Sequence, residues 1–444
     1  MFEIREGASP VTDVRAWTGQ LARLGRGLDD ADRIDLIRAL EELACAAAAA
    51  QAVVSADFDA SQRADQASRG VPAAGRGRGV AAQIALARRE SPHRAQQHLG
   101  LAKILRAELP ETMKAFRAGR ITEWKATLVA RETACLRRED RAAVDAELAG
   151  NPEQIETMGD GEVVAEARRL AYRLDPSSFV ERRRRAEAER RVTLRPAPDV
   201  MSQLSALLPV KAGVAVYAVL TREAARLRAA GDPRSRGQLM ADVLLDRIVS
   251  PGADTTTKSG PAGALINLTV SDDVLFGGSD EAGHVDGYGP VPADLARELA
   301  FGDGLDDQHR RWFRRLYTDP GTGSLVAMDS TARLMPPALA GVLRLRDRTC
   351  RTPWCDAPIR HSDHVRPVLD GGETSERNGQ GLCEACNHAK QAPGWRAGPA
   401  PGIRHTVETT TPTGHTHRST APATGDAIYR ERSPGRWVLV AVAA

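Results

Sequence analysis

The sequence has few aromatic residues, no long apolar run and no visible leader, and each shortage excludes something. Phenylalanine, tryptophan and tyrosine make up 4% of the 444 residues, so a large core must be built from Ala, Leu, Val and Ile. No uninterrupted apolar run approaches the roughly 20 residues that cross a bilayer. The first six residues lack the basic and apolar regions of a secretory signal. We therefore expect a cytoplasmic protein without a membrane partner.

An excess of either charge is also missing. The chain carries 61 Lys and Arg against 58 Asp and Glu, a formal net charge of +3. Such an even balance indicates neither a nucleic-acid partner nor a membrane partner by itself. Only six of the 61 cations are Lys. Arg suits bidentate phosphate contacts, although a GC-rich genome produces the same bias without a functional cause.

The apolar pattern from residue 29 to about residue 249 predicts one helix after another. Ser91 and Pro92 form an N-cap and a first turn, Pro110 and Thr122 begin two further helices, and Gly150 follows the end of a fourth. No run typical of a parallel strand interrupts this pattern. We therefore predict a mainly α protein that begins with an all-helical domain.

An arginine-rich segment within this region has two interpretations. Residues 181–195 contain seven Arg and three Glu. The first interpretation is a solvated helix with ion pairs between residues three or four apart. The second is a face that follows phosphates, which the local net charge of +4 keeps open.

A breaker-rich stretch at residues 250–261 marks the clearest boundary. Beyond it, the pattern predicts a strand, a hairpin around a Gly-rich turn, and a short helix that leads into a cysteine cluster. The predicted organisation has five parts. They are an N-terminal segment (1–28), a helical domain (29–250), a linker with a hairpin-containing connecting region (251–340), a small metal-stabilised domain (341–396) and a Thr/Pro/Gly-rich tail with a terminal strand (397–444).

Four of the six cysteines lie within 37 residues, as two close pairs separated by 27 residues. The pairs are Cys350 with Cys355 and Cys383 with Cys386. Two such pairs in a cytoplasmic protein are typical of a structural tetrahedral zinc site, because each pair forms one knuckle around the metal. Four thiolates leave no open coordination position, so this Zn²⁺ is not expected to be the catalyst.

Oxygen and imidazole ligands flank the second pair. Asp363 and an amide oxygen suit a hard cation such as Mg²⁺, and His364 is then free to act as a base near neutral pH. Adjacent residues of a strand point to opposite sides, so these two can present a metal ligand and a base across one phosphate. Four cations are close enough in sequence to contact phosphates: Arg360, Arg366, Arg377 and Lys390.

This arrangement resembles the HNH endonuclease motif, the ββα-metal finger. The resemblance covers residues 341–396 and rests on Asp363-His364, Gly371-Gly372, Asn378 and the run from Cys383 to Asn387. The helical region resembles the domain of unknown function 222 that precedes an HNH module in actinobacterial proteins. That second resemblance rests on residues 118–122, 182–195 and 231–239.

The HNH resemblance implies a role for each matching residue. His364 matches the general base, Asp363 and Asn387 match the ligands of a catalytic Mg²⁺ or Mn²⁺, and Asn378 matches the residue that holds the loop orienting the histidine. The four cysteines match the structural zinc of many members. The third letter of the motif is often His, so His388, beside Asn387, is a second choice of ligand.

The leading hypothesis is therefore a divalent-metal-dependent HNH endonuclease that hydrolyses DNA. The alternative is a zinc-stabilised DNA-binding or regulatory protein with little or no catalysis. Action on RNA stays open, because such a finger contacts phosphates rather than bases. The sequence predicts neither an oligomeric state nor a cleavage site.

Overall fold

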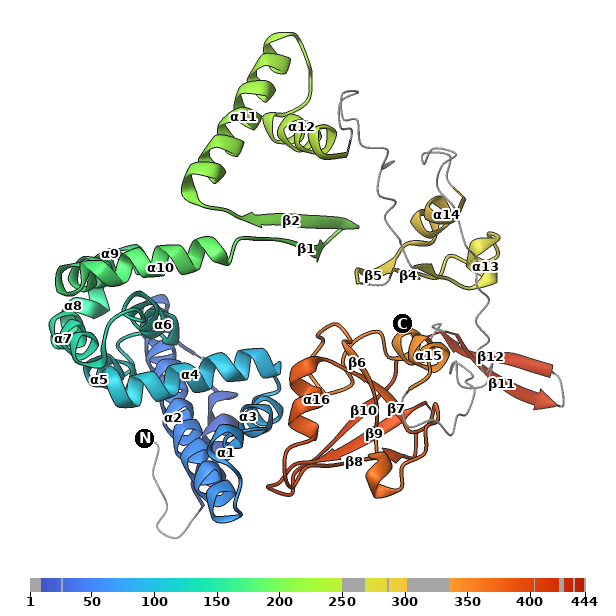
Figure 1. Ribbon diagram of the computed structural model, residues 1–444, viewed down its shortest axis with the longest axis horizontal. Coiled ribbons are helices and arrows are strands. Elements are labelled where there is room, and N and C mark those ends of the chain that lie inside the picture. The colour runs from blue at the N-terminus through green and yellow to red at the C-terminus, as the bar shows by residue number, and fades with distance from the viewer. Residues whose placement is uncertain are drawn as a thin grey trace. The chain divides into compact units, whose positions relative to one another are not determined.

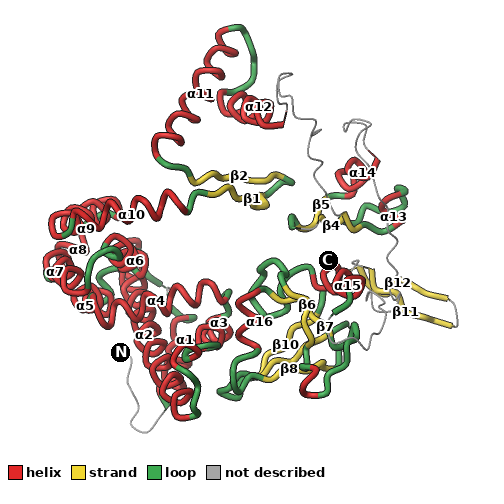
Figure 2. Tube along the Cα trace, in the orientation of Figure 1, coloured by secondary structure: helices red, strands yellow, loops and turns green. Residues whose placement is uncertain are grey.

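In this computed structural model, the chain divides into two compact units. Figure 1 labels the helices and strands. The first unit is Met1–Ala81 with Arg94–Val180, and the second is Ala82–His93 with Glu181–Ala444. The first consists of helices and the second contains all the strands that the structure describes (Figure 2). The predicted helical N-terminal region and the small strand-rich C-terminal region are confirmed. The structure describes residues 9–24, 27–249, 268–285, 287–301, 335–402, 404–422, 427–433 and 436–442.

Capping residues set the helix boundaries of the first unit. The Thr122 side chain accepts a hydrogen bond of 3.1 Å from the Lys125 amide, as the predicted N-cap requires. Pro110 occupies the first turn of its helix, where its missing N–H costs nothing. The helices are α1 (Pro10–Leu21), α2 (Asp30–Ser68), α3 (Val80–Arg88, which enters the second unit), α4 (Pro92–Glu108), α5 (Pro110–Arg117), α6 (Glu123–Glu132), α7 (Arg138–Ala149), α8 (Pro152–Thr157) and α9 (Asp160–Leu174).

The core of the first unit is aliphatic, as the shortage of aromatic residues predicts. Among the residues that the structure describes, Phe116 is the one aromatic side chain in the buried core. It lies in a single cluster with Leu105, Leu148 and Leu170, all fully buried. Small alanine side chains fill the remaining space and let the helices approach one another closely.

Helix α2 is the one helix in the described part of the chain that could cross a membrane by length and composition. A core helix of a soluble protein passes the same test. Cys45 and Ala49 of α2 belong to the core cluster of the first unit, and Ala52 and Ala56 pack against Ala102 of α4. One face of α2 is therefore used for packing within its own unit.

The structure departs from the all-helical prediction at the arginine-rich segment. Helix α10 (Pro176–Ala188) ends early, and a two-stranded antiparallel hairpin follows, β1 (Arg191–Ala197) and β2 (Met201–Leu207). Pro196 cannot continue a helix. Asp199 and Val200 both have positive φ, 59° and 60°, in the turn of residues 198–200 that joins the two strands.

Further elements of the second unit precede the cysteine cluster. The predicted short helix before the first cysteine is present as α15 (Pro337–Asp347). The predicted linker at 250–261 and hairpin at 316–328 lie outside the described residues. The other elements are α11 (Val210–Ala229), α12 (Arg236–Val249), β3 (Leu268–Thr269), α13 (Asp272–Leu275), β4 (Gly283–Val285), β5 (Gly289–Val291) and α14 (Ala293–Phe301).

The metal-finger region is a short antiparallel pair followed by a helix. Strand β6 (His361–His364) pairs with β7 (Gly379–Leu382), and α16 (Glu384–Lys390) follows directly. The region expected to be a tail holds more strand than predicted. A three-stranded antiparallel sheet and a hairpin occupy it: β8 (Arg396–Ala400), β9 (Thr406–Thr410), β10 (Thr416–Thr420), β11 (Ala427–Ser433) and β12 (Arg436–Val442).

Candidate functional site

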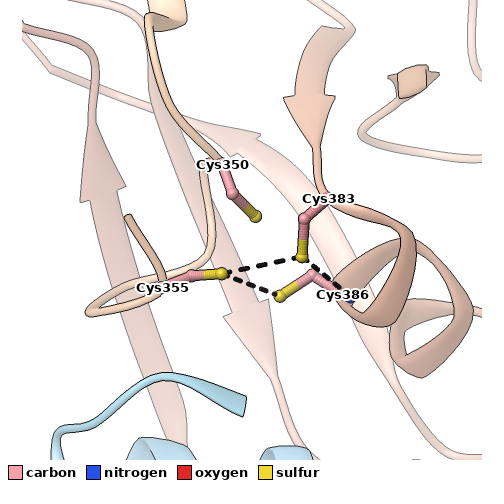
Figure 3. Close-up of side chains that lie close together, drawn as sticks. All are labelled: Cys350, Cys355, Cys383 and Cys386. Atoms are coloured by element: carbon pink, nitrogen blue, oxygen red, sulfur yellow. Dashed lines mark hydrogen bonds between the residues drawn. The ribbon is translucent and has the colours of Figure 1, made fainter. Parts of the chain in front are cut away.

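The four clustered cysteines converge on one point (Figure 3). Their sulfur atoms all lie within 4.8 Å of one another, and Cys355 Sγ is 3.6 Å from the sulfurs of both Cys383 and Cys386. A tetrahedron with Zn–S bonds of about 2.3 Å has sulfur–sulfur edges of about 3.8 Å. The donor set and its spacing therefore fit a structural zinc ion.

Local structure prepares this cluster for a metal. Cys383 is the N-cap of α16, and its sulfur accepts a hydrogen bond of 3.4 Å from the Cys386 amide. An amide that donates to a cysteine sulfur favours the thiolate that metal binding needs. Among the residues that the structure describes, these four form the one group of three or more His, Cys, Asp or Glu side chains close enough to share an ion.

Asp363 and His364 end strand β6, beside the entry to α16. In the register of the sheet, Asp363 is opposite Gln380, and His364 is opposite Gly379. The two side chains point to opposite faces of the strand. Contacts between α16 and β6 bring the helix that bears Asn387 beside this strand. The structure therefore brings the predicted base and both predicted ligands into one region.

The imidazole of His364 is held in place and kept neutral. Its Nε2 lies 2.7 Å from the hydroxyl oxygen of Thr374. Burial lowers the pKa of His364, the carboxylate of Asp363 opposes this shift, and the ammonium of Lys390 adds to it. A neutral imidazole with one fixed nitrogen is the form that a general base requires.

Asn378 fastens the loop between β6 and β7. Its side chain accepts a hydrogen bond of 2.9 Å from the Arg366 amide and donates to the carbonyl oxygens of Arg366 and Glu373 at 3.0 and 2.7 Å. A Cβ atom at Gly372 would lie 1.9 Å from the Arg366 carbonyl oxygen, so only glycine fits this tight turn. These contacts support the loop-holding role expected of Asn378.

Asn387 contributes an unusual acceptor. Its Oδ1 is buried and lacks a hydrogen-bond partner among the residues that the structure describes. A buried amide oxygen without a partner is costly, and a bound cation would remove that cost. The neighbouring His388 is exposed on the same helix.

The ammonium of Lys390 occupies an unexpected position. Its Nζ lies 2.5 Å from Asp363 Oδ2, and it also donates to the His364 carbonyl oxygen. The charge of Lys390 is therefore paired inside the site in this structure, and its predicted phosphate contact stays a prediction. The other three cations of that prediction, Arg360, Arg366 and Arg377, are exposed.

A network of buried charged side chains, which the sequence analysis did not predict, supports the backbone of the site. Arg346 holds Asp347 through two hydrogen bonds of 2.8 and 3.0 Å, and both residues are almost completely buried. Arg346 also donates to the carbonyl oxygens of Glu376 and Gly379, on either side of Asn378. The network therefore fixes the backbone around Asn378.

The same network joins the C-terminal sheet to the finger. Arg351 donates to the carbonyl oxygens of Ser419 and His405, at 2.6 and 3.2 Å. The His405 ring contacts the Arg377 carbonyl oxygen at 3.0 Å. Burial lowers the pKa of His405 to about 4, so the ring stays neutral near pH 7. No motif marks these residues, because their partners lie 28 to 68 positions away.

The buried carboxylate of Asp347 should be important for stability. We expect Asp347→Asn to destabilise the finger by about 3–5 kcal/mol, because it removes the one fully buried carboxylate that pairs with Arg346 and Arg351 and leaves Arg346 only the partly exposed Glu376. Hydrogen exchange of peptides covering β6 and β7 measures the effect. Arg418→Gln, which removes an exposed ion pair with Glu408, is the matched control and should cost about 1 kcal/mol or less. Equal protection in both variants would contradict this role.

Comparison with known proteins agrees with this geometry. Residues 37–347 match the family described as Domain of unknown function (DUF222), and residues 350–392 match the HNH endonuclease family. The chain is 32% identical over 209 residues to the uncharacterized protein Rv3776 of Mycobacterium tuberculosis. That match spans 46% of this chain and 32% of the relative's length. No solved structure matches the chain significantly.

Proposed function

Because the chain belongs to the DUF222 family and carries an HNH endonuclease domain after that region, we propose that it is a metal-dependent endonuclease that hydrolyses DNA. The relative from Mycobacterium tuberculosis is uncharacterized and the chain covers about a third of it, so it adds no function. The proposal therefore depends on the site itself. It also includes action in the cytoplasm, where the four thiols can hold zinc rather than form disulfides.

The buried, partnerless Oδ1 of Asn387 is the observation that carries the proposal. This oxygen lies on the helix that packs against the strand of Asp363. A carboxylate and an amide oxygen are hard ligands of the kind that Mg²⁺ or Mn²⁺ prefers. His364, held by Thr374, is not needed as a ligand and is available for proton transfer.

The residues of this chain divide the chemistry of phosphodiester hydrolysis between them. His364 takes a proton from the attacking water through the ring nitrogen that Thr374 does not hold. Asp363 and Asn387 would hold the divalent cation, which supplies stabilisation of negative charge on the phosphate when bound. Asn378 keeps the loop near His364 in one conformation. Arg366 and Arg377, both exposed, suit contacts with neighbouring phosphates.

Removal of the Asn387 amide tests the metal site. We expect Asn387→Ala to raise the Mg²⁺ concentration needed for half-maximal cleavage by about 10-fold or more, since even outer-shell changes cost 10–100-fold in metal affinity. Cleavage of a labelled DNA duplex at a series of Mg²⁺ concentrations measures this shift. His388→Ala is the matched control, one residue along the same helix and exposed. A larger shift for His388→Ala would transfer the ligand role to His388.

The contact between Lys390 and Asp363 favours a second candidate function, DNA binding without cleavage. With the ammonium 2.5 Å from Asp363 Oδ2, the carboxylate is already neutralised, and a cation must displace Lys390 to bind there. If the pair persists in Mg²⁺, the domain binds DNA as a zinc-stabilised module. DNA binding in the absence of cleavage in any divalent metal would favour this second function.

A further inference from the structure

An exposed segment far from the HNH domain in sequence concentrates positive charge. This arginine arm, residues 181–195, comprises the C-terminal half of α10, the link to β1 and the first five residues of β1. It holds seven Arg and three Glu. We propose that the arginine arm binds the phosphate backbone of duplex DNA and so gives the DUF222 region a role in holding the substrate. This inference rests on the proposed function, because it takes DNA as the substrate.

The hairpin places most of its polar and cationic side chains on one face and its apolar side chains on the other. Arg191, Thr193 and Arg195 alternate along β1 and share one face of the strand. Across the pair, Ser205 and Gln203 lie opposite Thr193 and Arg195 on that face, and the exposed Leu207 lies opposite Arg191 at its end. The other face presents apolar side chains such as Leu194 and Leu204. The strand therefore adds a polar, cationic face to the arginines of α10.

Most of this charge is not neutralised within the protein. The two ion pairs inside the arm, Arg183 with Glu187 and Arg185 with Glu181, each measure 3.6 Å and lie on exposed side chains. Exposed pairs of this length are weak and are readily replaced. Four other guanidinium groups have no carboxylate within 4 Å in the part of the chain that the structure describes: Arg184, Arg190, Arg191 and Arg195. The ion-paired interpretation of this segment therefore leaves most of its charge unexplained.

The shape of the arm favours DNA over double-stranded RNA. The major groove of B-DNA, about 12 Å wide, admits a helix or a two-stranded ribbon, and ribbons are used in this way by known DNA-binding folds. The major groove of A-form RNA is too narrow for side chains to read. The arm is a helix followed by a two-stranded ribbon, and both carry arginines. These dimensions fit the major groove of B-DNA and not that of A-form RNA.

Binding in the absence of cleavage tests the arm. The protein used carries His364→Ala, which blocks the proposed chemistry. One probe is a fluorescent DNA duplex of about 24 base pairs, and the other is a double-stranded RNA of the same sequence. A variant with Arg184, Arg190, Arg191 and Arg195 replaced by Gln is compared with its parent over a range of salt concentrations. Each phosphate contact contributes about 0.9 to the slope of log K against log salt. We expect the slope of log K against log salt to fall by about 3.6 in the variant, and its affinity to be at least 10-fold weaker near 0.1 M salt.

A charge-matched control separates local binding from net charge. Replacing Arg106, Arg137, Arg169 and Arg173 by Gln also removes four exposed arginines, but each of these has a carboxylate partner. This control should retain the parental slope. Unchanged affinity and slope in the arm variant, an equal loss in the control, or tighter binding to the RNA would overturn the inference. Because binding is measured without cleavage, loss of binding in the arm variant supports the arm even if the wild-type protein cuts nothing.

Discussion

Replacing His364 by alanine is expected to reduce the rate of DNA cleavage by about 10²–10⁴-fold, the usual contribution of a general base. The ring is buried, held at 2.7 Å by Thr374 and kept neutral by burial. DNA affinity should stay within about twofold of the wild type, since the buried ring donates nothing to a phosphate. Single-turnover cleavage together with a binding titration measures both quantities.

His361 provides the matched control for this substitution. It lies three residues earlier on the same strand and is half-buried. His361→Ala should cleave at close to the wild-type rate. Equal cleavage by the wild type and His364→Ala would remove His364 from the mechanism, and a loss confined to His361→Ala would make His361 the base.

Loss of one cysteine ligand should have the largest effect on structure. We expect Cys383→Ser to abolish zinc binding and to unfold the finger, because metal binding is coupled to folding in small zinc domains. Cys383 is also the N-cap of α16, which bears Asn387. The variant should therefore lose DNA cleavage together with zinc. Metal analysis of the purified protein and hydrogen exchange of β6, β7 and α16 measure the two effects.

Cys135 supplies the control for the cysteine series. It stands alone in sequence beside the core of the first unit and is partly buried. Cys135→Ser should retain one equivalent of zinc and a protected finger. Full zinc content in Cys383→Ser, or an equal loss in Cys135→Ser, would contradict the four-cysteine site.

The features that could be predicted from the sequence depend on local chemistry. The N-cap at Thr122 and the helix before Cys350 are set within one or two turns of chain. The zinc ligands follow from spacing, because two knuckles need little beyond their own residues. The proposed catalytic residues were identified from a motif whose members lie within 25 residues, His364 and Asn387 among them.

The features that could not be predicted depend on long-range contacts or unusual backbone. The charge pattern of the arginine-rich segment is compatible with a helix, but its end forms strand β1 of a hairpin. The turn of that hairpin contains Val200 with a positive φ, which valine rarely adopts. Arg351 reaches Ser419 across 68 positions, and nothing in either local sequence marks the pair. The ion pair between Lys390 and Asp363 joins residues 27 positions apart, and nothing in the local sequence predicts it.

We expect cleavage of DNA by this protein to need a divalent cation in addition to the structural zinc ion. Nicking of supercoiled plasmid by protein that carries one equivalent of zinc, with and without added Mg²⁺, tests it most directly. We expect nicking only when Mg²⁺ is added. Equal nicking by the zinc-loaded protein without Mg²⁺, or intact plasmid under both conditions, would contradict it.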